Sequence, residues 1–212
     1  KSWPETRAPW PSSPTEWPSM PAPVHSKYLG DGALYLWEIG KQANCMSEGQ
    51  IRDLFYRISI IRKAFPTIMS QWMDEIPVAT VPLNIRFGLA AGSVYRLSYA
   101  YNSRSEYMGY AINLASRLQK YCPEMGFLSS ARIEIPQDSL EKIGYQKLVT
   151  RQLRGFPREV VIVRKSTYEK LPKERKETLF IDLPSGQVPS VAEFTPIADR
   201  IKRSFDSEQN LG

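Results

Sequence analysis

The sequence has little of what several large classes of protein depend on. No apolar run approaches the roughly 18 residues of a membrane-spanning helix, and the first residues carry no signal-peptide pattern. The two cysteines, Cys45 and Cys122, are too few for a disulfide framework and too far apart for a metal knuckle. We therefore expect a cytoplasmic protein with reduced thiols and no membrane contact.

Most hydrolytic chemistry lacks its usual residues. The single histidine, His25, would have to serve as a base without a G-x-S-x-G nucleophile elbow, and we expect it to be structural. The metalloprotease pattern H-E-x-x-H and the P-loop pattern G-x-x-x-x-G-K-[ST] are also missing. What remains is metal-assisted attack at a phosphorus atom, which needs positioning and charge neutralisation but no histidine.

The chain is basic, with a formal net charge of +6 and a pI near 9.3. Much of the excess lies in 165–176 and 200–203, where acidic residues are interleaved, and this pattern favours a solvated surface. Attraction of a triphosphate is the alternative. Because no arginine-rich arm, zinc finger or helix-turn-helix is present, we expect no specific nucleic-acid binding.

The 212 residues predict one domain with extensions. Residues 1–23 hold seven of the seventeen prolines, which predicts an extended arm whose regularly spaced Trp3, Trp10 and Trp17 pin it to the surface or dock a partner. We expect a catalytic domain over 24–183 and a weakly amphipathic helix with a polar tail over 184–212.

The first half of the domain predicts a hairpin and a helix. Val24–Leu29 and Ala33–Glu38 alternate as two strands around a Gly30-Asp31-Gly32 tip. Ser47 and Gln50 form a capping box for a long helix. Its apolar face is expected to contain Ile51, Leu54, Phe55, Ile58, Ile61 and Phe65.

The second half mixes strands and helices without repeated βαβ units, so we predict an α+β domain. The pattern favours a strand over Leu83–Leu89 and a second over 88–97, with Gly88 and Gly92 bracketing a turn where side chains would block close approach. A loop over 99–110 is expected to lead into a helix over Ala111–Tyr121 that Pro123 stops. An antiparallel pair is expected from Tyr145–Leu153 and Glu159–Arg164, turning at Arg154-Gly155-Phe156-Pro157.

Three polar residues suit phosphate chemistry. Asp31 at a tight, glycine-flanked tip is placed to bind Mg²⁺, which prefers carboxylate and phosphate oxygens. Asn113 and Arg117, four residues apart, share one helix face and could stabilise charge on a reacting phosphate. Each feature is also commonplace, because Asp-Gly is a frequent hairpin turn and such a helical pair often faces solvent.

The motifs together are more specific. The succession K-x-x-G-D, G-x-x-x-G, Y-x-G-x-x-I-N-x-A-S-R-L-Q and L-R-G-F resembles the catalytic domain of class III nucleotidyl cyclases, in order from Val24 to Arg164. The resemblance implies a ferredoxin-like βαββαβ core with a mixed, mainly antiparallel sheet and flanking helices. It also implies a homodimer, in which the metal-binding and transition-state residues of each site come from opposite subunits.

The same resemblance implies residue roles. Asp31 would bind Mg²⁺ or Mn²⁺, and Asn113 and Arg117 would be the catalytic transition-state pair. Lys27 and Glu106 would recognise the base, and Arg154 would contact the triphosphate, on a looser alignment. The form EYMGYAINLASRLQ is most similar to the stand-alone bacterial anti-phage cyclases that make cyclic UMP or cyclic CMP.

UTP is therefore the expected substrate and cUMP the expected product. By donor and acceptor type alone, an amine and a carboxylate fit uracil, cytosine and adenine, so cyclic CMP and cyclic AMP stay open. The chain departs from the family in having no aspartate before Asp31, where a second metal ligand belongs. We expect an N-terminal piece to be missing from the sequence; the alternative is a catalytically inactive module that binds nucleotide or a partner.

Overall fold

The computed structural model describes residues 21–29, 32–40, 46–71, 82–99, 102–151, 153, 155–156 and 158–181. They belong to two compact units that divide between Ile85 and Arg86. The domain limits predicted at residues 23 and 183 are not tested by this division. None of the helices in these described ranges is long and apolar enough to cross a membrane.

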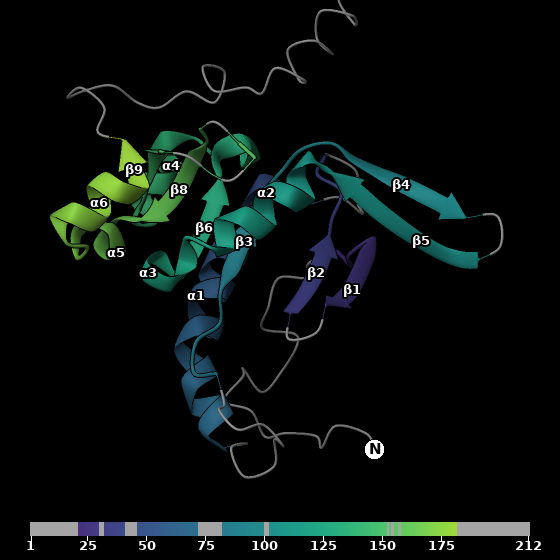
Figure 1. The fold of residues 1–212 in the computed structure, drawn as a ribbon, viewed down its shortest axis with the longest axis horizontal. Coiled ribbons are helices and arrows are strands. Elements are labelled where there is room, and N and C mark those ends of the chain that lie inside the picture. Colours follow the sequence, from purple (N-terminus) through teal and green to yellow (C-terminus); the bar gives the residue numbers. More distant parts are fainter. Residues whose placement is uncertain are drawn as a thin grey trace, which may run out of the picture. The chain divides into compact units, whose positions relative to one another are not determined.

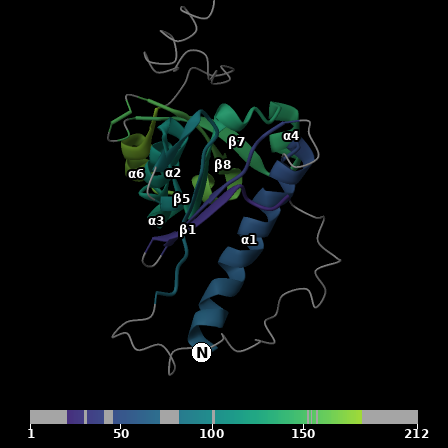
Figure 2. The ribbon, with the colours of Figure 1, turned by 90° about the vertical axis from the view of Figure 1, so that its right-hand side faces the viewer.

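The first unit contains a hairpin and one long helix. β1 (His25–Leu29) pairs antiparallel with β2 (Gly32–Leu36), so the predicted hairpin is confirmed with slightly shorter strands. Gly30 and Asp31 at its tip lie outside the described residues. α1 (Glu48–Gln71) is one continuous helix in Figure 2.

The predicted capping box begins α1. The backbone N–H of Ser47 donates to Oε1 of Gln50 over 2.9 Å, and the N–H of Gln50 donates to the Ser47 hydroxyl over 3.4 Å. The reciprocal bonds satisfy two of the amide groups that a helix N-terminus leaves unpaired. Of the predicted apolar face, Ile51, Phe55 and Ile58 are buried, and Leu54, Ile61 and Phe65 are partly buried.

The second unit is built on a five-stranded sheet in the order β3-β6-β8-β7-β9 (Figure 1). β3 pairs parallel with β6, and the other neighbours pair antiparallel. The unit is therefore α+β with a mixed, mostly antiparallel sheet, which is broadly compatible with the predicted ferredoxin-like core. The strands are β3 (Phe87–Leu89), β6 (Phe127–Ser130), β7 (Tyr145–Thr150), β8 (Val160–Arg164) and β9 (Phe180–Ile181).

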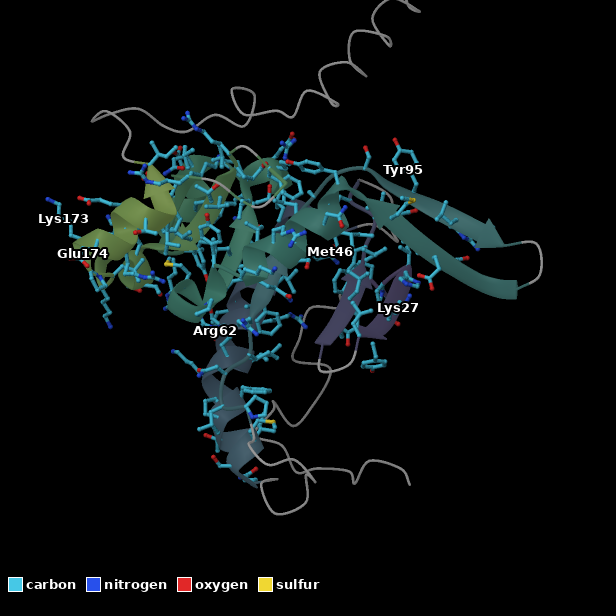
Figure 3. The ribbon with its side chains drawn as sticks, viewed as in Figure 1. Lys27, Met46, Arg62, Tyr95, Lys173 and Glu174 are labelled. Carbon is cyan, nitrogen blue, oxygen red and sulfur yellow. The ribbon has the colours of Figure 1, made fainter. Side chains whose placement is uncertain are left out.

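The crossover between the parallel strands β3 and β6 contains a second hairpin and a helix. β4 (Val94–Tyr99) pairs antiparallel with β5 (Asn102–Gly109), and α2 (Tyr110–Gln119) follows at once. α2 packs on β3 and β6, which agrees with a helical connection between parallel strands (Figure 1). Tyr95 projects from the hairpin and is well exposed (Figure 3).

Several predicted boundaries are wrong. Of the loop expected over 99–110, Asn102–Gly109 form strand β5, because pairing with β4 satisfies the backbone hydrogen-bonding groups of a segment whose side chains show no apolar alternation. The strand expected over 83–89 shrinks to β3, and the next begins only at Val94. The helix expected over Ala111–Tyr121 ends at Gln119, before Pro123 as predicted, and Pro123 itself lies in the first turn of α3 (Cys122–Met125), where its missing N–H costs nothing.

The remaining elements cover the sheet. η2 (Ala131–Ile133) is a single 3₁₀ turn, and α4 (Gln137–Lys142) packs on β7. The basic segment predicted only as solvated surface forms α5 (Lys165–Glu169) and α6 (Lys173–Leu179), both largely exposed. The C-terminal helix predicted over 184–212 and the arm over 1–20, with Trp3, Trp10 and Trp17, lie outside the described residues.

One hydrophobic core joins α2 to the sheet. β8 is its central strand, and Val160–Val163 are completely buried, as expected of a strand covered on both faces. The predicted β7–β8 pair is confirmed, with Tyr145 opposite Arg164 and Val149 opposite Val160. The core cluster consists of Leu114, Leu118, Met125, Leu128, Leu153, Phe156, Val161, Val163 and Phe180.

Candidate functional site

α2 presents the predicted polar pair on the side away from its buried stripe. Ala111, Leu114 and Leu118 face the core, whereas Asn113 is exposed and Arg117 is half-buried. The pair is one helical turn apart, so both side chains extend over the same surface. An amide and a guanidinium in this arrangement can donate several hydrogen bonds to one anionic group.

Two glycines allow close backbone contacts at α2 and directly before it. A Cβ atom at Gly88 in β3 would lie 2.0 Å from the carbonyl oxygen of Ala115 in α2, and one at Gly109 would lie 2.5 Å from the carbonyl oxygen of Ser93. Neither distance is compatible with a side chain. The close approach predicted at Gly88 is thus confirmed, and it fixes how near the helix lies to the sheet.

Gly92 allows the chain before β4 to contact α2, because its backbone conformation is one that favours glycine. Its φ is 155°, which L-residues rarely adopt, and a Cβ there would lie 3.5 Å from the Cβ of Ala111. The chain between β3 and β4 therefore lies directly against the first turn of α2. Three glycine positions together define the seat of the helix that carries Asn113 and Arg117.

A buried polar cluster anchors the start of α2, and sequence reasoning missed it. The hydroxyl of Tyr110 donates to Oε2 of Glu159 over 2.7 Å. Nε of Arg132 donates to Oε1 of the same carboxylate over 2.7 Å, and Nη2 donates to the Tyr110 oxygen over 3.3 Å. We call these three residues the Tyr110 cluster. It connects α2, η2 and the residue directly before β8.

The Tyr110 cluster is largely buried and contains one charge of each sign. The side chain of Glu159 is 1% exposed and that of Arg132 is 11% exposed. The Arg132 guanidinium carbon also lies 4.8 Å from the centre of the Tyr110 ring. Since a buried carboxylate is costly unless it is paired and hydrogen-bonded, Glu159 depends on both partners.

Burial raises the pKa of the Tyr110 hydroxyl well above its usual range. The hydrogen bond to Glu159 and the negative charge of that carboxylate raise this pKa further, and Arg132 partly offsets them. Tyr110 is thus held in its protonated, hydrogen-donating form. The ring can serve as a fixed anchor but not as a general base near neutral pH.

The turn that carries Arg154 lies beside the same anchor. The ring of Phe156 meets the Tyr110 ring edge-on, with the ring centres 4.9 Å apart. Leu153 and Phe156 exchange two backbone hydrogen bonds of 3.2 and 2.8 Å, and Gly155 between them has a positive φ of 87°. Arg154 itself lies outside the described residues, whereas Phe156, two residues further on, lies against the first residue of α2.

The other predicted site residues are distributed over both units. Glu106 lies in β5 opposite Leu97, seven residues before Asn113, so the second unit contains Glu106, Asn113 and Arg117. Lys27 lies in β1 of the first unit, opposite Leu34, and is half-buried (Figure 3).

The described residues do not form a metal site. Across the described ranges, no group of three or more His, Cys, Asp or Glu side chains could hold a metal ion. Asp31, the predicted ligand, lies outside those ranges. The assignment of Mg²⁺ or Mn²⁺ therefore stays a prediction from the motif.

No protein-family model, curated protein or solved structure matches this chain. The likeness to cyclases thus depends on the sequence motifs alone.

A weak sequence signal could have revealed the Tyr110 cluster. Glu159 is an acid at the start of the apolar run VVIV, and Arg132 stands between Ala131 and Ile133, both buried. A charged residue in an apolar segment needs a partner of opposite charge. The signal does not say which partner, because 27 residues separate the two.

Proposed function

We propose that this protein is a class III nucleotidyl cyclase that converts a nucleoside triphosphate, preferentially UTP, to the 3′,5′-cyclic nucleotide and pyrophosphate. The observation that carries the proposal is the placement of Asn113 and Arg117 one turn apart on the accessible side of α2. The motif Y-x-G-x-x-I-N-x-A-S-R-L-Q supplies the family, and the seating of α2 by three glycines and the Tyr110 cluster is what such a pair would need.

The reaction forms one bond and breaks one. The ribose 3′ oxygen attacks the α-phosphorus and loses its proton to solvent, while the bond from that phosphorus to the bridging oxygen of the β-phosphate breaks. Negative charge develops on the α-phosphate oxygens and on the leaving pyrophosphate. Arg117 donates charge-assisted hydrogen bonds to these oxygens, and the amide of Asn113 holds the ribose or a phosphate oxygen.

Substrate binding is assigned to the remaining predicted residues. Lys27 and Glu106 pair with the base, the amine donating to O4 of uracil and the carboxylate accepting from N3–H. Arg154 contacts the triphosphate. Asp31 would hold a divalent metal ion, which would supply charge neutralisation at the phosphates.

The proposal includes a homodimer and a biological role. Asp31 of one protomer and Arg117 of its partner would face the same nucleotide, giving two sites. The cyclic pyrimidine nucleotide would act as a second messenger in defence against phage. The test is to incubate purified full-length protein and Mn²⁺ with each of the four triphosphates and to identify any cyclic product by mass. This experiment tests the reaction and the choice of base together.

The outcomes separate the candidate functions. Cyclic UMP as the main product supports the proposal, cyclic CMP or cyclic AMP reassigns the base, and no product from any triphosphate with a dimeric preparation favours an inactive binding module.

A further inference from the structure

None of the steps of the proposed reaction uses the residues of the Tyr110 cluster. Glu159 is buried, Tyr110 and Arg132 are partly buried, and the three side chains hydrogen-bond to one another, with one positive and one negative group and Tyr110 protonated. Replacing a buried ion pair by apolar residues is often neutral or stabilising, so stability alone does not account for the cluster. A buried polar network instead favours one arrangement of the elements it joins.

The elements it joins are those of the candidate site. Tyr110 is the first residue of α2, three residues before Asn113 and seven before Arg117. Its hydroxyl is fixed to Glu159, and its ring is fixed against Phe156 in the turn that carries Arg154. A shift of this anchor would therefore move Asn113 and Arg117 relative to Phe156 and the strand that follows it.

We infer that Tyr110, held by Glu159 and Arg132, is a positioning residue that sets where α2 lies relative to the Leu153–Phe156 turn. The inference rests on the proposed cyclase function for its effect on turnover. Tyr110 does not touch the substrate, and it acts through Asn113 and Arg117.

The test compares Tyr110→Phe with Leu140→Ala. Tyr110→Phe removes one hydroxyl and keeps the ring contact with Phe156. Leu140 is completely buried in α4, on β7, and its truncation destabilises the same unit without touching the Tyr110 cluster. Both variants are assayed at a temperature at which circular dichroism shows them folded.

We expect Tyr110→Phe to lower kcat by about tenfold to a hundredfold, because a displacement of about 1 Å can cost that much. KM should stay within about twofold of wild type, since the residues assigned to binding are untouched. Leu140→Ala should keep kcat within about twofold. Equal kcat values for the two variants would overturn the inference, whatever their stabilities.

Amide hydrogen exchange gives a readout that does not depend on activity. In Tyr110→Phe, exchange should rise at least tenfold over 110–119 and much less over β7; in Leu140→Ala it should rise mainly around α4 and β7. If wild-type protein makes no cyclic product, the proposed function fails, and hydrogen exchange alone tests whether Tyr110 anchors α2. A selective rise over 110–119 then supports it, and a uniform rise overturns it.

Discussion

The hydroxyl of Tyr110 and the carboxylate of Glu159 lie 2.7 Å apart, although 49 residues separate them in the sequence. The bond connects the first residue of the helix that presents Asn113 and Arg117 to the residue before the central strand of the sheet. Arg132 donates to the same carboxylate and completes the network. The candidate site is thus a displayed pair of side chains on a firmly anchored helix.

Alkaline pH should weaken this anchor. Because the folded state raises the pKa of Tyr110 above the unfolded value of about 10, the protonated hydroxyl contributes stability that is fully present below that pH and is lost as pH rises above it. Urea unfolding of wild type and Tyr110→Phe should therefore give free energies that differ by about 1–3 kcal/mol at pH 7 and converge above pH 10.

The comparison with Tyr110→Phe also removes the effect of Lys147. Burial lowers the pKa of Lys147 in β7, so its contribution changes in the opposite direction as pH rises. Since Lys147 is unchanged in both proteins, the difference between them isolates Tyr110. A constant difference from pH 7 to pH 11 would show that the hydroxyl is not held as the geometry indicates.

Arg117→Ala should abolish cyclic product while leaving the fold intact. Loss of one transition-state donor lowers kcat by on the order of 10²–10³, and Arg117 is half-buried at the edge of α2 and not in its core stripe. Lys120→Ala is the matched control, because it removes an exposed cation just beyond the C-terminus of the same helix. A folded Arg117→Ala enzyme with near-wild-type turnover would refute the role of Arg117.

Two inactive variants should restore activity when mixed. If Asp31 and Arg117 of one site come from different protomers, a heterodimer of Asp31→Ala with Arg117→Ala has one intact site and one site lacking both residues. Random exchange of equal amounts should give about a quarter of wild-type turnover. The measurement is product formation after unfolding and refolding the mixture together. Activity no higher than in either variant alone would place both residues in one protomer.

Gly88→Ala should destabilise the second unit by about 1–3 kcal/mol or more, because its methyl group would lie 2.0 Å from the carbonyl oxygen of Ala115. Gly32→Ala is the control: its nearest neighbour would be 3.8 Å away, so we expect a change within about 0.5 kcal/mol. Chemical denaturation followed by circular dichroism measures both. Similar effects at the two positions would show that α2 does not approach β3 so closely.

Local signals predicted much of the fold. The capping box of Ser47 and Gln50 marks the start of α1 because both partners lie within one turn of the chain. The β1–β2 and β7–β8 pairs were predictable because apolar, strand-forming residues flank their turns. The side-by-side display of Asn113 and Arg117 follows from helical periodicity alone.

Non-local pairing was not predictable in the same way. β5 is polar and shows no alternation, and it becomes a strand because β4 lies beside it. The parallel contact of β3 with β6 joins segments 40 residues apart in the register Phe87 to Phe127. The Tyr110 cluster likewise depends on three distant segments. The sequence shows that Arg132 and Glu159 lie in apolar segments, but it does not show that they pair with each other.

The central claim is that this chain makes a cyclic pyrimidine nucleotide with Arg117 at the reacting phosphate. The most direct measurement is mass spectrometry of the products after purified full-length protein is incubated with UTP, CTP, ATP or GTP and Mn²⁺, beside Arg117→Ala. The account predicts cyclic UMP and pyrophosphate from UTP with wild-type protein and none with the variant. No cyclic nucleotide from any triphosphate, or equal yields from both proteins, would contradict it.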